Sequence, residues 1–466
     1  MTFQFQDDFD GALAQARQKS IQRDARAVFL ALVEQVREEV VKIIPAVQLM
    51  HPDSRVEGTV RALARTIVDT WRNQNEGQGL SQSNEMLVEQ IVAEILGVGQ
   101  IGDLLDQPGV EDVVINGPGE VYMYRGGSWA RASVSFEDEA HVLRLLNRAI
   151  APTGRQVSPL SPVVDAIIPG GHRINIVMAP CAEPSPCASI RVRRSTGFTL
   201  SELLARDMGL NVIKQPRFSI PDYSSIAVPG AMLTAQAATF LHMAVLAGMN
   251  IVVVGATGVG KTSFLGALGR LIPSWRRIVA IEDTRELNMR QGEDGHPGNC
   301  VYFVTRLGGL EGTPPVTQAM LLRAALRQRP DALTLGEARG GEVLDLFKAL
   351  CTGHGNGLTS IHAENIAELV PRIKLMLQEA DIRTEIRDAM VAELLSRAFH
   401  LGLVLEMVPV ITPEGQGRIR QVVEIVEFSG TVEGGQPARQ TLFRYDRQKG
   451  QLVREKVYLT PRREAM

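Results

Sequence analysis

Residues 251–271 read IVVVGATGVGKTSFLGALGRL. The β-branched run at the start of this segment predicts a buried strand, and the residues from Lys261 onward predict a helix. Between them lies the spacing G-x-x-x-x-G-K-[ST], whose glycines allow the backbone to wrap around a polyphosphate and to point several N–H groups at its oxygens. The segment therefore predicts the first strand, phosphate loop and helix of an α/β nucleotide-binding domain.

The side chains of this loop predict how a nucleoside triphosphate and its metal ion are held. Lys261 can reach the β- and γ-phosphates, Thr262 can ligate Mg²⁺, and the N-terminus of the helix adds its positive dipole end. ATP and Mg²⁺ are the expected ligands. The residues expected to bind the nucleotide are Gly255, Gly258, Val259, Gly260, Lys261, Thr262 and Ser263.

Length and composition predict a multidomain protein that works inside the cell. The chain has 466 residues, enough for about three domains, and its formal net charge of −3 does not favour a nucleic-acid or membrane-surface partner. No signal-peptide pattern opens the sequence, and no apolar run approaches the roughly 20 residues of a membrane span. We expect the four scattered cysteines to be reduced, although a disulfide between Cys181 and Cys187 is an alternative.

Changes of pattern along the chain predict its domain boundaries. Residues 1–98 predict a small helical bundle, with docking of a partner as an open role, and residues 99–198 predict a mixed α+β domain. Residues 199–228 are irregular and proline-spaced, as in a linker. Helices and strands alternate over residues 229–405, which predicts a parallel sheet with crossover helices. Residues 406–466 predict a β-rich tail.

Polar side chains follow three further predicted strands of the parallel sheet. Glu282, Asp283 and Glu286 come at and after the end of the first, Glu337 follows the second, and His362 follows the third. Because the carboxyl ends of parallel strands meet at one edge of a sheet, we expect these groups near the phosphates, Mg²⁺ and the attacking water. Taken singly, the acids are common as helix caps and a lone histidine is more often structural. Because all of them follow one phosphate loop in order, a role in catalysis is favoured over these structural roles.

At this point the sequence resembles a known family. GATGVGKT, IEDTREL and RAALRQRPDALTLGEARGGEVLDLFKALCTGHGNGLTSIHA resemble the Walker A motif, Asp box, atypical Walker B motif and His box of type II/type IV secretion ATPases. The stretches EDVVINGPGEVYMYRGG, RQRPD and QVVEIVEF are most similar to the Tad-pilus assembly (CpaF/TadA) branch. The resemblance extends over about residues 98–430.

The resemblance implies a RecA-like P-loop ATPase domain, preceded by a helical segment and a PAS-like α+β domain. It implies a cytoplasmic homohexameric ring, peripherally bound to an inner-membrane platform protein, that uses ATP hydrolysis for pilin assembly or secretion. Motif by motif, Glu286 matches the Asp-box acid, Glu337 the Walker B acid and His362 the His-box histidine. Arg173 and Arg191 match arginines of the N-terminal domain that approach the phosphates.

Two assignments stay open at the level of sequence. Either Glu286 or Glu337 can activate water while the other serves the metal shell beside Thr262, and we favour Glu337 as the base. The closest alternative function is a conjugation or effector-export type IV secretion ATPase. A nucleic-acid motor and a scaffold that binds ATP without hydrolysing it are more distant alternatives, and we expect no direct nucleic-acid contact.

Overall fold

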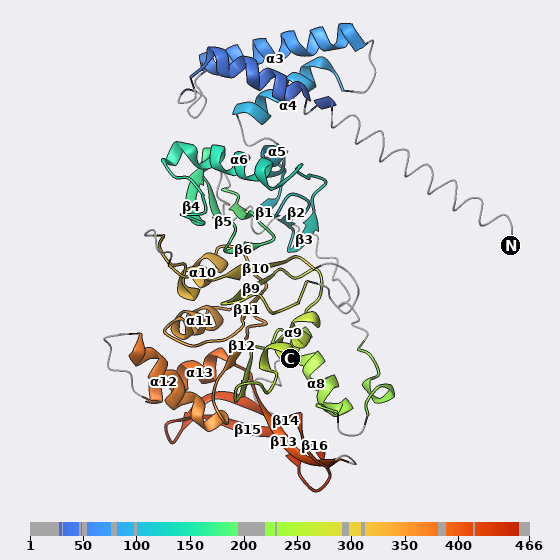
Figure 1. Ribbon diagram of the computed structural model, residues 1–466, viewed down its shortest axis with the longest axis vertical. Helices are drawn as coiled ribbons and strands as arrows, with labels where there is room; N and C mark the ends of the chain where they lie inside the picture. Colours follow the sequence, from blue (N-terminus) through green and yellow to red (C-terminus); the bar gives the residue numbers. More distant parts are fainter. Residues whose placement is uncertain are drawn as a thin grey trace, which may run out of the picture.

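The fold is described from a computed structural model of the whole chain. It describes residues 31–45, 54–75, 82–96, 100–193, 220–228, 231–290, 298–308, 313–353, 355–380, 388–412 and 415–455, together with 28, 29 and 48. The predicted linker between residues 199 and 219 and the last part of the predicted tail, 456–466, lie outside these ranges. The described parts stack along one long axis, with a helical bundle at one end and β-strands at the other (Figure 1).

The N-terminal bundle forms from helices that each bury one apolar stripe. A helix over residues 31–43 packs with α3 (Ser54–Asn75) and α4 (Asn84–Leu96). In α3 the buried residues recur every fourth position, which places them on one face of a helix. They are Val56, Val60, Ala64 and Val68. Over its described residues this region is therefore a small helical bundle.

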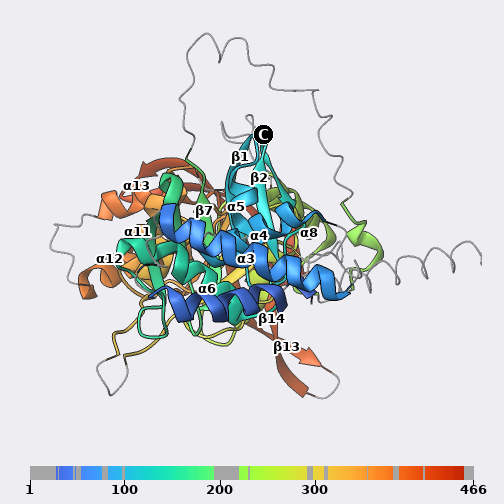
Figure 2. The ribbon, with the colours of Figure 1, turned by 90° about the horizontal axis from the view of Figure 1, so that it is seen from above.

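The bundle is attached to the next domain through buried polar contacts. Glu94, only 4% exposed, places Oε1 2.8 Å from Nε2 of His141 on α6 (Glu139–Ile150). Arg148 of α6 also donates to the carbonyl oxygen of Ile95 over 3.1 Å. Viewed from above, α3 crosses over α6 (Figure 2).

The second domain is a six-stranded antiparallel sheet covered by α5 (Gln100–Leu105) and α6. Its strand order is β3-β2-β1-β7-β5-β4. Gly126 and Gly127, which have φ values of 61° and 87°, form the two-residue turn between β2 and β3; a positive φ at both positions fits a type I′ hairpin. The strands are β1 (Val110–Asn116), β2 (Val121–Arg125), β3 (Ser128–Arg131), β4 (Val163–Ile168), β5 (His172–Val177) and β7 (Cys187–Arg191).

The third domain is built on a ten-stranded sheet whose central six strands run parallel. The order is β16-β15-β14-β13-β8-β12-β11-β9-β10-β6, with parallel pairing from β13 to β10. The parallel strands are β8 (Ile251–Gly255), β9 (Ile278–Glu282), β10 (Cys300–Val304), β11 (Ala332–Leu335), β12 (Leu358–Ile361) and β13 (Leu401–Thr412). All but the long β13 are short apolar runs, as expected of strands covered on both faces.

Helices cover both faces of this sheet. On one face α8 (Ala235–Leu246) and α9 (Lys261–Arg270) enclose one apolar core, and a second core lies under α10 to α13 on the other. Helix α11 shows the sequence cause, because Val343, Leu346, Phe347 and Leu350 follow helical spacing and all are buried. The helices of the second face are α10 (Gln318–Ala325), α11 (Glu342–Cys351), α12 (Leu369–Glu379) and α13 (Asp388–Ala398). The predicted alternation of helix and strand is confirmed.

The predicted β-rich tail extends the same sheet. β13 pairs with β8 over Leu401–Leu405, and β14 (Gly415–Glu433), β15 (Gln436–Asp446) and β16 (Gln451–Arg454) continue from it as an antiparallel meander. The outer half of the β13–β14 hairpin projects from the body of the molecule (Figure 2).

The second and third domains share a buried junction. β6 (Ala182–Glu183), from the proline-rich loop between Cys181 and Cys187, pairs antiparallel with β10 and so joins the ten-stranded sheet. Cys181, Cys187 and Cys300 are buried, Cys351 is exposed, and none of the four forms a disulfide in this structure. Among the described helices, none combines the length and apolar character needed to cross a bilayer.

Candidate functional site

The phosphate loop joins the end of β8 to the start of α9. Gly258 and Gly260 have φ values of 82° and 92°, a region that residues with a Cβ rarely adopt. At Gly255 the limit is space, because a Cβ would lie 2.5 Å from the carbonyl oxygen of Leu405. Gly260 stands at the N-cap of α9 without a side-chain cap, so the first N–H groups of the helix remain directed at the loop. The loop has the geometry of an anion cradle.

Lys261 turns its ammonium group back into this cradle. Its Nζ donates to the carbonyl oxygens of Gly255 and Ala256 over 2.8 and 3.0 Å, and lies 3.2 Å from Nδ1 of His362. Burial lowers the pKa of Lys261, opposed by the charge of Glu337 and assisted by that of Arg339. The three protons of the ammonium are thereby shared among two loop carbonyls and one imidazole nitrogen.

Thr262, Ser263 and Val259 are the other expected loop residues, and they differ in exposure. Thr262 is partly buried and Ser263 is exposed, at the first turn of α9. Val259 is buried in the apolar core beneath the loop, together with Leu265. The side chain of Val259 therefore anchors the loop to the core, and its expected contact with phosphate is through the backbone N–H.

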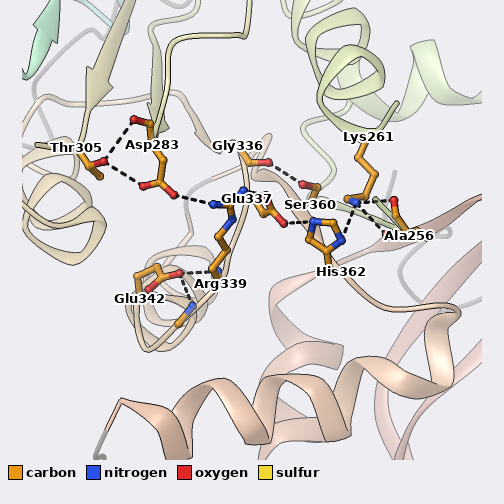
Figure 3. A network of polar contacts seen from close by, with 12 residues as sticks. Ala256, Lys261, Asp283, Thr305, Gly336, Glu337, Arg339, Glu342, Ser360 and His362 are labelled. Atoms are coloured by element: carbon orange, nitrogen blue, oxygen red, sulfur yellow. Dashed lines mark hydrogen bonds and ion pairs between the residues drawn. The ribbon is translucent and has the colours of Figure 1, made fainter. Parts of the chain in front are cut away.

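Glu337 and His362 meet beside Lys261, as strand order predicts. β11 and β12 are neighbours and β12 lies beside β8, so the residues that follow their carboxyl ends share one edge. Nε2 of His362 lies 2.5 Å from Oε1 of Glu337 (Figure 3). Burial lowers the pKa of His362, and the charges of Lys261 and Arg339 lower it further against the opposing effect of Glu337. A neutral imidazole that accepts from Lys261 at Nδ1 carries its proton at Nε2, toward the carboxylate.

Arg339 extends the network and was not anticipated from the sequence. Its guanidinium donates to Oε2 of Glu337 over 2.6 Å and lies 3.5 Å from Oδ2 of Asp283, whose Oδ1 accepts from the Thr305 hydroxyl over 3.1 Å. Figure 3 shows this line of contacts, from Lys261 through His362 and Glu337 to Asp283. Oε2 of Glu337 is thus held by an arginine, whereas Oε1 lies against the imidazole without a hydrogen bond of ordinary geometry. An arginine two residues behind the Walker B acid was the only available signal.

The acidic segment after β9 has two different carboxylates. Glu282 is 3% exposed and Oε1 accepts from the backbone N–H groups of Glu286 and Leu287 over 3.0 and 2.8 Å. Burial raises the pKa of Glu282 against the effect of these two hydrogen bonds. Glu286 itself is exposed, and its charge contributes to the raised pKa of Arg339. Glu282 shapes the turn, and Glu286 is free to face a ligand.

The oxygen donors around the loop suit Mg²⁺. Over the described ranges, no group of three His, Cys, Asp or Glu side chains is placed to hold a metal by itself. Mg²⁺ in nucleotide sites commonly takes one or two protein oxygens and completes its shell with water and phosphate. A Thr262 hydroxyl with one carboxylate fits that donor set.

Arg173 and Arg191 lie on β5 and β7 of the second domain. They are partners in the β5–β7 register, both are exposed, and they line a cleft of about 580 Å³ that also holds Arg155 and Arg327. Nε of Arg191 lies 3.1 Å from Oδ1 of the buried Asp112. Five strand spacings separate β8 from β6 in the shared sheet, or about 24 Å at a spacing of about 4.8 Å. Within one chain these arginines do not meet the phosphate loop, and their role stays a prediction.

Comparisons with known proteins agree with this geometry. Residues 95–442 match the family described as Type II/IV secretion system protein. A putative conjugal transfer protein of Mycobacterium tuberculosis is 33% identical over 289 residues, which cover 61% of this chain and 74% of the relative. The type IV secretion system protein PtlH of Bordetella pertussis is 30% identical over 322 residues, 69% of this chain and 91% of the relative.

A solved structure is similar over the same part of the chain. The crystal structure of the VirB11 ATPase from the Brucella suis type IV secretion system, in complex with sulphate, aligns with a TM-score of 0.55 and 28% identity. The alignment covers 70% of this chain and 91% of that structure.

Proposed function

The chain belongs to the type II/IV secretion system protein family, and from that premise we propose that it is a hexameric ATPase that powers pilus assembly or protein secretion. Membership of this family supports ATPase activity, without specifying the machine that the ATPase serves. The observation that carries the proposal is the line of contacts from Lys261 through His362 to Glu337, formed at the carboxyl ends of β8, β12 and β11. It combines a phosphate cradle, a buried cation and a held carboxylate at one edge of the sheet.

In the proposed reaction, Glu337 is the base. Its carboxylate is fixed by Arg339 at Oε2, and Oε1, beside His362, has no hydrogen-bond partner and is left to orient a water and accept its proton. Glu286, which is exposed and close enough for its charge to act on Arg339, serves the metal shell with Thr262. Mg²⁺ supplies charge neutralisation of the phosphates. Most of the rate enhancement then comes from positioning and electrostatics.

His362 is placed to report the state of the phosphates. All three ammonium protons of Lys261 already have acceptors within the chain. A phosphate oxygen that binds Lys261 must replace one of them, and the imidazole is the acceptor that a side-chain rotation can remove. When this contact is lost, Nδ1 no longer has to accept a hydrogen bond, so the imidazole proton need not stay on Nε2, beside Glu337. Phosphate binding and orientation of the base are thereby coupled through one histidine.

The arginines point to a site completed between subunits. Arg173 and Arg191 are exposed and line a cleft together with Leu326 and Arg327 of the third domain. In a ring, the N-terminal domain of one subunit can present them to the ATP of another, which supports a homohexamer with shared sites. We further propose that the domains 99–198 and 229–405 are PAS-like and RecA-like, and that changes in their relative angle transmit force to a platform protein at the inner membrane.

Two machines remain candidates for the motor. The motifs quoted above, including RQRPD and QVVEIVEF, support the Tad-pilus assembly branch. The names of the relatives, which include type IV secretion and conjugal transfer proteins, support a conjugation or effector-export ATPase as the second candidate. In both, the cargo is a pilin or secreted protein reached indirectly.

A complementation experiment tests the shared site. We expect Lys261→Ala and the double variant Arg173→Ala/Arg191→Ala each to hydrolyse ATP at least about tenfold more slowly than wild type. Mixed at equal concentration, they should regain activity, because arginines of the first variant can serve the intact loops of the second. Wild-type turnover per subunit should also rise cooperatively with protein concentration, and Glu337→Gln should bind ATP without hydrolysing it.

The contrary outcomes are equally specific. Mixtures no more active than the average of the two variants would show that each chain supplies its own arginines, or that the arginines play no part. A turnover per subunit that does not change with concentration would argue against the ring. Full hydrolysis by Glu337→Gln would remove the base assignment.

A further inference from the structure

The β13–β14 hairpin forms one wall of the phosphate loop. The carbonyl oxygen of Leu405 on β13 lies so close to Gly255 that no side chain fits between them. The pairing of β13 with β14 shifts register between Val404 and Leu405, where β14 contains one extra residue. Beyond this bulge the hairpin continues past the end of β8 and over the loop.

Arg420 of β14 reaches the loop directly. Its Nε donates to the carbonyl oxygen of Gly258 over 3.3 Å, and its Cδ lies 3.3 Å from the position that a Cβ would take at Gly260. Side chains alternate along a strand, so Arg420 shares a face with Val422, which is buried in the same core as Val259. The arginine is therefore the residue at which this face leaves the core and meets the two glycines that carry positive φ.

We propose that Arg420 contacts the polyphosphate of the bound nucleotide, as a second cation supplied by the same chain that supplies Lys261. The proposal rests on the ATPase function proposed above. It concerns a residue 159 positions beyond the loop lysine, in the part of the chain that carries no nucleotide motif.

The chemistry of the side chain suits this role. The guanidinium is exposed, and within the described residues its two terminal amino groups make no hydrogen bond. With Nε held by Gly258, the planar fork of these amino groups remains to bind phosphate oxygens, which match it in geometry and charge. Lys261 donates to the carbonyl oxygens of Gly255 and Ala256 and Arg420 to that of Gly258, so two cations approach the same loop from different parts of the chain.

The position of Arg420 links the β13–β14 hairpin to nucleotide binding. Arg420 lies on the same strand as the outer, projecting part of the hairpin, only a few residues away from it. Contact between Arg420 and phosphate would tie this arm to the occupied loop. Release of phosphate would remove one of its attachments.

Nucleotide titration of full-length variants tests the proposal. Arg420→Gln keeps an N–H donor but removes the charge, whereas Arg420→Lys keeps the charge. Arg418→Gln is the matched control, because Arg418 is exposed on the same strand and face but about 7 Å farther along it. We expect Arg420→Gln to weaken ATP and ADP binding, measured by calorimetry, by about tenfold or more. Arg420→Lys should lose less, and Arg418→Gln less than about twofold.

Melting of the nucleotide-free proteins separates contact from folding. All three variants change exposed side chains, so their melting temperatures should match that of wild type. ATP affinity of Arg420→Gln within about threefold of wild type would overturn the proposal, as would equal losses in the Lys and Gln variants with a lowered melting temperature. If wild type and Arg418→Gln themselves failed to bind or hydrolyse ATP, the proposed function would fail instead.

Discussion

Two buried cations mark two regions with different tasks, the phosphate loop and the junction between the second and third domains. Lys261 is 7% exposed and Arg277 is fully buried, and burial lowers the pKa of both. Arg277 donates to Gln328, Asn116 and Asn299 over distances of 2.6 to 3.0 Å. These acceptors of the guanidinium come from both domains and are neutral, whereas the backbone N–H of Arg277 donates to the carboxylate of Asp331 over 2.7 Å.

The difference lies in what the acceptors can do. Lys261 shares its protons with an open loop and with His362, which can turn away when a phosphate arrives. Arg277 has a fixed set of partners that includes the polar edge of β1, so any movement leaves buried polar groups unsatisfied. We therefore expect a catalytic role for Lys261, whose acceptors are exchangeable, and a structural role for Arg277, whose acceptors are not.

Replacement of Lys261 by alanine should have the largest effect, and it tests the expected catalytic role of this residue. ATP hydrolysis should fall by about 10²–10³-fold or more, because the charge that meets the phosphates is lost. The fold should persist, since the two loop carbonyls can face water. Phosphate release and thermal melting measure the two properties separately. Retention of more than a tenth of the activity would contradict the assignment.

Replacement of Arg277 by methionine tests the structural role of this residue in the junction between the second and third domains. It removes the arginine donor from Asn116, Asn299 and Gln328 in a buried junction, which should destabilise the protein by about 3 kcal/mol and lower the melting temperature by about 5–10 °C. Arg276→Met is the matched control, since Arg276 is partly buried and its side chain donates to the carbonyl oxygen of Leu246 over 3.4 Å. Equal melting temperatures for the two variants would show that the junction does not depend on Arg277.

The smallest expected effect is a change in the pKa of His362, which tests whether its contacts with Lys261 and Glu337 are as described. Its pKa is lowered in the fold, so the neutral form is favoured, and the stability linked to it is complete above the usual value of about 6.5 and is lost as the pH falls below that value. Removal of the nearby charges should act in opposite directions. Lys261→Ala should raise the pKa of His362 and Glu337→Gln should lower it, each by less than about one pH unit. NMR titration of the imidazole measures both, and shifts of the same sign would contradict the contacts.

The sequence predicted the core of the site because that core is built from strand ends. A parallel sheet places the residues after β8, β11 and β12 at one edge, so the order of motifs was enough to bring Lys261, Glu337 and His362 together. The same reasoning found the helical bundle, the mixed α+β domain and the strands of the tail. Each of these depends on the local periodicity of apolar residues, which the sequence displays directly.

Other features depend on contacts between residues far apart in the chain. The two-residue strand β6 lies in a proline-rich loop, and only its partner β10 makes it a strand. Arg277 has the sequence context of a surface residue, yet it is buried because a second domain covers it. Arg420 lies over the phosphate loop because β14 pairs with β13, and β13 with β8.

By itself, then, the sequence determined the nucleotide-binding motif, the alternation of helices and strands, and the family, because these are recorded in spacing and periodicity. Tertiary structure decided which charges meet. It brought Arg339 and Arg420 to the site, and it placed Arg173 and Arg191 in a cleft lined also by Leu326 and Arg327 of the third domain. The physical reason is that a charge interacts with its neighbours in space, and spacing along the chain does not specify those neighbours once they come from different strands and domains.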